Sequence, residues 1–182
     1  MRINQTTKTA AAHFTPALNN DKETRKAQLR EKIRRLNEEL TTMTSRRDRM
    51  KNGVERLGEQ LRSLDSKIHD LDGKIYSVEL EISRLEGKRA AAKEKKRNAE
   101  TSDEKWRWQD VIWKLSDQIS RKTDQRYNLR EQRSQAVNDR YTKKDKKQSL
   151  EYKLSDLRYQ IDQKTRERDH AKEELRRLES PW

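Results

Sequence analysis

Apolar residues recur three and four positions apart in one unbroken register from Leu29 to Ala92, and in a second register from Trp108 to Leu178. This spacing holds one apolar stripe along a helix for many turns, which is typical of a coiled coil. We call the stripe positions of both stretches the seam. In the first stretch they are Ile33, Leu36, Leu40, Met43, Met50, Val54, Leu57, Leu61, Leu64, Ile68, Leu71, Ile75, Val78, Ile82 and Leu85, with interruptions at Arg47 and Arg89.

The two registers are separated by a polar segment, residues 93–105. Beyond it the apolar residues resume two positions away from where the first register would place them. A continuous coil usually accommodates insertions of three or four residues, so a turn is the simpler explanation. Thr101 with Glu104 forms a capping box that can begin a second helix, and Asn20 with Glu23 can cap the first.

The sequence therefore predicts an all-α fold, a long antiparallel two-helix coiled-coil hairpin with a flexible N-terminal tail. Its parts are a tail at residues 1–20, a first helix at 21–98, a turn at 99–102 and a second helix at 103–180. Folding the chain about the turn predicts that Leu85 lies near Leu115, Met50 near Leu150, and Leu36 near Lys164.

The second register keeps its spacing but loses its apolar character in the middle. There the seam of the first helix, from Val54 to Val78, must face mostly basic residues, namely Lys122, Arg126, Arg133, Arg140, Lys143 and Lys147. Long basic side chains can lay their methylenes on an apolar surface and keep the charge in water. Alternatively, this stretch of the first helix binds a helix of another protein or of a second copy, giving a homo-oligomer.

Composition excludes several classes of function. Charged residues make up 42% of the chain and hydrophobic residues 29%, which is too polar for an ordinary globular core. There is no cysteine, no apolar run near the ~20 residues that cross a bilayer, no phosphate-binding loop and no zinc-ligand spacing. His13, His69 and His170 are isolated. We therefore predict no catalytic residue, no metal site, no cofactor and no membrane span.

Aromatic residues form a row on the outer side of the second helix. Trp106 and Trp113 are seven residues apart, and Tyr127 and Tyr141 fall on the same heptad position further along. Closing a hairpin does not require such a row, and exposed aromatics are typical anchors for partner proteins. We call these four residues the aromatic row and predict that it binds a partner. Chance placement on a solvated helix face is the alternative.

A basic patch lies at the end of the first helix, and the net charge of +13 favours acidic partners. The patch consists of Lys88, Arg89, Lys93, Lys95, Lys96 and Arg97, which are opposed by Glu94. Basic residues with interleaved aromatics can bind single-stranded nucleic acid. However, acidic residues are threaded through the basic part of the second helix, and the sequence contains no nucleic-acid-binding motif. We keep nucleic-acid binding as an alternative that this pattern disfavours.

The stretch WRWQDVIWKLSDQI, residues 106–119, resembles the start of the second helix in the flagellar export stalk protein and its type III secretion counterparts. The shared features are Trp106, Gln109, Ile112, Leu115 and Ile119 after a polar turn. The resemblance implies an antiparallel two-helix coiled coil without enzymatic activity. It also implies a cytoplasmic location and contacts with the secretion ATPase, the export gate or chaperones.

Residues 1–20 contain no acidic residue and are rich in Thr, Asn and Ala. They resemble the N-terminal signals of type III secretion substrates, so export as an effector is a second hypothesis, and a passive tail is the simpler interpretation. The first hypothesis is a non-enzymatic structural or adaptor protein that spaces or couples components of an assembly, in the form of a secretion stalk.

Overall fold

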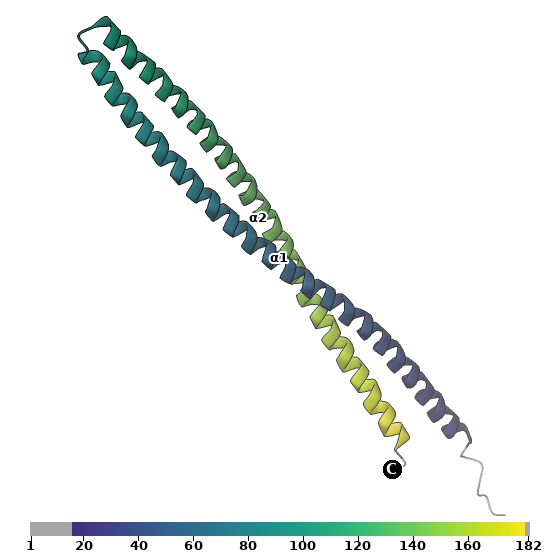
Figure 1. Ribbon diagram of the computed structural model, residues 1–182. Coiled ribbons are helices and arrows are strands. Elements are labelled where there is room, and N and C mark those ends of the chain that lie inside the picture. The colour runs from purple at the N-terminus through teal and green to yellow at the C-terminus, as the bar shows by residue number, and fades with distance from the viewer. Residues whose placement is uncertain (1–15, 181–182) are drawn as a thin grey trace, which may run out of the picture. The chain divides into compact units, whose positions relative to one another are not determined.

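The computed structural model describes residues 16–180, which form two helices, α1 (Pro16–Asn98) and α2 (Ser102–Glu179). The described residues contain no strand. The helices pack against each other in opposite directions on either side of a short turn, as Figure 1 shows. The predicted all-α antiparallel hairpin is therefore confirmed. No helix among residues 16–180 has a stretch long and apolar enough to cross a membrane.

The helix boundaries differ slightly from the sequence prediction. α1 begins at Pro16, so Asn20 is not its N-cap and residues 16–20 belong to the helix rather than to the tail. Proline suits the first turn of a helix, because its missing N–H has no partner there and its φ angle is already helical. The tail prediction for residues 1–15 lies outside the described residues.

The turn itself is one residue shorter than predicted, and α2 begins at Ser102. The Thr101 hydroxyl accepts a hydrogen bond from the Glu104 N–H at 3.2 Å, and the Lys105 N–H donates to the Thr101 carbonyl at 3.2 Å. Asp103 and Glu104 place negative charge in the first turn, where the helix dipole favours it. Thr101 therefore caps α2 as its sequence context predicted.

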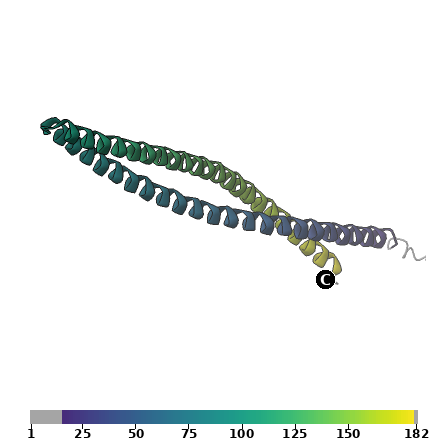
Figure 2. The same cartoon turned by 45° about the horizontal axis from the view of Figure 1, so that its top comes forward.

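The chain divides into two compact units. The turn unit is Gly53–Leu150, and the terminal unit combines α1 up to Asn52 with α2 from Glu151 onward. In both Figure 1 and Figure 2 the teal part of α1 and the green part of α2 lie side by side in the turn unit.

The predicted seam is the core of both units. Every seam position from Leu29 to Ala92 and from Trp108 to Leu178 is buried or half-buried. All the buried apolar residues fall on it: Leu29, Leu36, Leu40, Leu71, Ile75, Val78, Ile82, Ala92, Ile112, Ala136, Leu154, Leu157 and Ala171. The three- and four-residue spacing thus determines which side of each helix packs.

The terminal unit is held by its seam and by ion pairs between the helices. Lys32 pairs with Glu167 at 2.9 Å, and Lys164 pairs with Glu39 at 2.9 Å. All four side chains remain well exposed, so the pairs contribute little to stability and serve mainly to align the two helices. Lys32 and Lys164 hold the pKa of Glu167 below its usual range, because both favour the ionised carboxylate.

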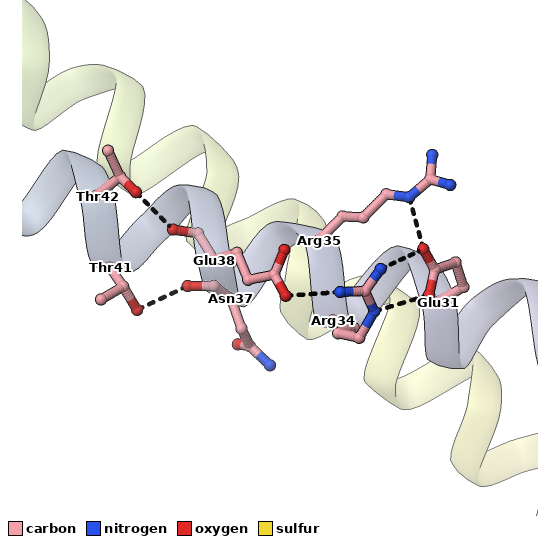
Figure 3. Close-up of polar contacts among 7 residues, drawn as sticks. All are labelled: Glu31, Arg34, Arg35, Asn37, Glu38, Thr41 and Thr42. Carbon is pink, nitrogen blue, oxygen red and sulfur yellow. Dashed lines mark hydrogen bonds and ion pairs between the residues drawn. The ribbon is translucent and has the colours of Figure 1, made fainter.

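A second set of ion pairs lies within α1 of the terminal unit (Figure 3). Arg34 forms hydrogen bonds with both Glu31 oxygens and with Glu38, and Arg35 also donates to Glu31. The hydrogen bonds from Arg34 and Arg35 lower the pKa of Glu31 from 4.5 to about 2. In the next turn two threonine hydroxyls donate to carbonyl oxygens four residues earlier. These contacts support the helix on its solvent side.

The pairing of the helices in the turn unit is displaced by about one turn from the prediction. Leu85 borders a recess with Gln118 and Lys122, which lie three and seven residues beyond its predicted neighbour Leu115. Likewise Lys143 donates to Gln60 at 2.9 Å, and an added Cβ on Gly53 would lie 2.9 Å from Leu150. Both the predicted and the observed alignments set seam residues of one helix against seam residues of the other, so the heptad spacing alone does not distinguish them.

The seam of α1 in the turn unit has two sections that differ in burial. In the tip section Leu71, Ile75, Val78 and Ile82 are at most 9% exposed. In the base section, Val54 to Ile68, all five seam residues are only half-buried. The expectation that basic residues leave the α1 seam from Val54 to Val78 partly uncovered is therefore right for Val54 to Ile68. It is wrong for Leu71, Ile75 and Val78, which are buried although they face basic residues.

Candidate partner-binding surface

The aromatic row is exposed along its whole length. Trp106 is 65% exposed, Trp113 59%, Tyr127 72% and Tyr141 58%. The four residues are separated by multiples of seven and so occupy one heptad position. α2 therefore presents their rings along one line of its surface. Four large rings are therefore exposed on a helix whose other exposed residues are mostly charged or polar.

Trp106 and Trp113 border a shallow recess near the turn. The recess has a volume of about 260 Å³ and is also lined by Lys96, Lys105 and Gln109. The Lys96 ammonium donates a 2.6 Å hydrogen bond to the Gln109 amide oxygen, which ties the end of α1 to the start of α2. The two indoles therefore flank a fixed polar floor, which provides both apolar area and hydrogen-bonding groups for a partner.

The neighbouring Trp108 has a different role. It occupies the seam and is half-buried, and the Lys95 ammonium lies 4.8 Å from its ring centroid. A cation over an indole face is a favourable electrostatic contact. Trp108 thus stabilises the closed end of the hairpin, while Trp106 and Trp113 project from it.

Further along the row, charged residues of both helices meet beside Ser134. Arg133 forms an ion pair with Asp72, and Arg130 pairs with Glu79 at 2.6 Å. The hydrogen bond and charge of Asp72 raise the pKa of Arg133. These four residues border a recess of about 470 Å³ between Tyr127 and Tyr141 in the row. A partner on the row would meet alternating charges here.

The predicted basic patch is only partly available for binding. Arg97 pairs with Glu94 at 3.1 Å, Lys96 bonds to Gln109, and Lys95 lies over Trp108. Arg89 occupies a seam position and is half-buried. Four of the six patch residues are therefore engaged within the hairpin, and Lys88 and Lys93 remain exposed.

Sequence reasoning missed two features of this surface. Tyr76 of α1 is 64% exposed, and Tyr152 and Tyr159 in the terminal unit are 69% and 63% exposed. It also missed the carboxylates that pair with basic residues across the helices, at Asp65, Asp72, Glu79 and Glu81. The seven-residue spacing of the first three was a visible signal.

Residues 16–180 contain no group of three or more His, Cys, Asp or Glu side chains placed to hold a metal ion. No polar or charged side chain of residues 21–180 is buried.

Comparisons of the chain with protein-family models, with curated proteins and with solved structures found no match.

Proposed function

We propose that this chain is a non-enzymatic coiled-coil adaptor that binds a partner protein through the aromatic row and spaces or couples parts of an assembly. The single observation behind this proposal is the exposure of four large rings on one line of α2, between 58% and 72%. Tryptophan and tyrosine anchors dominate binding energy at many protein interfaces, because they bury much area with little loss of rotamer freedom.

The more specific form of the proposal is a stalk of the flagellar or type III export apparatus. It rests on the resemblance of residues 106–119 to the second helix of that family, and the antiparallel pairing of α1 with α2 is compatible with it. On this proposal the chain works in the cytoplasm, and its partners are the export ATPase, the export gate or chaperones.

The test is affinity capture with purified candidate partners, beginning with the export ATPase of the source organism. Trp106→Ala with Trp113→Ala should abolish retention, since each tryptophan removed at an interface costs roughly 2 kcal/mol or more. Tyr152→Ala with Tyr159→Ala is the matched control, because it removes two equally exposed rings from the terminal unit.

Retention of every partner by the tryptophan variant, with unchanged helix content by circular dichroism, would show that the row is not the binding surface. Failure of the ATPase, gate and chaperones alone to bind the wild-type chain would remove the stalk assignment. The adaptor proposal would then be tested by comparing the tryptophan variant with the wild-type chain for binding to other partner proteins.

A further inference from the structure

A third recess lies in the turn unit, away from the aromatic row. It has a volume of about 320 Å³, and its walls are mainly aliphatic. α1 contributes Glu81, Arg84, Leu85 and Lys88, and α2 contributes Arg121 and Lys122 among others. The floor residue Leu85 is a seam position that remains half-buried, so part of its apolar surface is open at the recess.

This recess and the aromatic row lie on opposite flanks of the seam. Lys88 directly precedes the seam residue Arg89, and Gln118 directly precedes Ile119. The row residue Trp113 instead directly follows Ile112. At 3.6 residues per turn, the position before a seam residue and the position after it point to opposite sides of the helix. We call the recess bordered by Leu85 and Lys88 the flank recess.

The cations around the flank recess fall into two classes. Lys122 pairs with Glu81 at 2.5 Å, and Arg121 pairs with Asp117 at 2.9 Å. Arg84 and Lys88 form no hydrogen bond or ion pair with any residue in the range 16–180. They are four residues apart and exposed, so their charges lie on the same side of α1. Two unpaired positive charges therefore border an open apolar floor.

We infer that the flank recess binds an acidic peptide segment of a partner protein, placing one apolar side chain on Leu85 and carboxylates on Arg84 and Lys88. Charge complementarity supports this occupant, because the recess offers unpaired cations and the chain as a whole has a net charge of +13. Single-stranded nucleic acid would stack its bases on aromatic rings, and none lines this recess. An aliphatic floor suits a side chain of a peptide.

The test uses the full chain and a fluorescein-labelled peptide in which one central leucine is flanked on each side by four glutamates. Fluorescence anisotropy should show saturable binding to the wild-type chain. Arg84→Glu with Lys88→Glu should weaken it by at least about tenfold, because two attractive charges at the recess become two repulsive ones facing an acidic peptide. Arg62→Glu with Lys67→Glu is the control, since it makes the same change in charge at exposed sites outside the recess.

One further variant and one further peptide distinguish binding in the recess from nonspecific electrostatic attraction to the chain. Gln118→Trp keeps every charge but places a large ring at the edge of the recess, and it should also abolish binding. A peptide with serine in place of the central leucine should bind at least about fivefold more weakly, because it cannot bury apolar area on Leu85. Circular dichroism confirms that each variant retains its helices.

Several outcomes would overturn the inference. These are equal weakening by the recess and control variants, equal binding of the leucine and serine peptides, and no binding of either peptide by the wild type. Tighter binding of a single-stranded oligonucleotide, lost with Arg84→Glu and Lys88→Glu, would assign the recess to nucleic acid instead. Displacement of the peptide on self-association of the chain would assign it to a second copy. None of these results affects the aromatic row, which is tested by its own variants.

Discussion

The tip and base sections of the turn unit share one heptad register, but their seam residues are buried to different extents. In the tip section Leu71, Ile75 and Val78 are 4–9% exposed, whereas the seam residues of the base section, Val54 to Ile68, are all half-buried. Both sections face a seam of α2 that is rich in lysine and arginine. A cation opposite an apolar residue therefore does not by itself leave that residue exposed.

The difference lies in what surrounds the cations. In the tip section carboxylates of α1 draw the basic side chains across the seam, as in the Arg133–Asp72 and Lys122–Glu81 pairs. Their methylenes can then cover the apolar residues beneath. In the base section Arg140 likewise pairs with Asp65, but Lys143 bonds to the neutral Gln60. Gly58, which adjoins Lys147, has no side chain that could cover the seam.

The largest expected effect comes from truncating one leucine in each section. Leu71→Ala should lower the free energy of unfolding by roughly 2–3 kcal/mol, whereas Leu61→Ala should lower it by only about 1 kcal/mol, because a half-exposed side chain loses less on truncation. Urea titrations followed by circular dichroism measure both. Equal losses of unfolding free energy in the two variants would contradict the difference in packing between the sections.

The seam cation of the base section provides the next test. Arg140→Leu should raise the stability by about 1 kcal/mol, because leucine would cover the half-exposed seam opposite and the Asp65 pair that it removes is well exposed. Arg133→Leu in the tip section should leave stability nearly unchanged, since Leu71 beside it is already covered. Unfolding measured at low concentration, with light scattering to exclude association, tests this. Destabilisation by Arg140→Leu would contradict the account.

The glycines give the smallest and most local comparison. An added Cβ on Gly73 meets nothing within 4 Å, so Gly73→Ala should stabilise the helix by roughly 0.8–1 kcal/mol. On Gly53 it would lie 2.9 Å from the Leu150 side chain, which must shift, so Gly53→Ala should gain clearly less. Thermal unfolding of the two variants tests this order. A larger gain for Gly53→Ala would show that the helices are farther apart at that point.

Much of the fold could be predicted from the sequence. The heptad spacing identified every buried seam residue, and Thr101 with Glu104 located the start of α2. The spacing could not give the pairing of the helices in the turn unit to within one turn, because several alignments bring seam residues of α1 near those of α2. In the terminal unit Leu36 and Lys164, predicted to be neighbours, do line the same recess. The start of α1 was misplaced because Asn20 is a good cap in isolation, while the helix-compatible φ angle of Pro16 favoured an earlier start.

The candidate site was predicted in part. The heptad position of Trp106, Trp113, Tyr127 and Tyr141 indicated their exposure, which the structure shows. The flank recess could not be foreseen, because it depends on which residues of α2 lie beside Leu85. Its unpaired cations, Arg84 and Lys88, become distinct from their paired neighbours only when both helices are in place.

Amide hydrogen exchange of the wild-type chain, resolved by residue, tests the central claim most directly. Local opening is easier where fewer apolar contacts are buried, so exchange measures the packing of each section without any substitution. The account predicts that amides of α1 from Leu71 to Ile82 exchange at least about tenfold more slowly than those from Val54 to Ile68. Equal protection of the two sections, or greater protection of the base section, would contradict it.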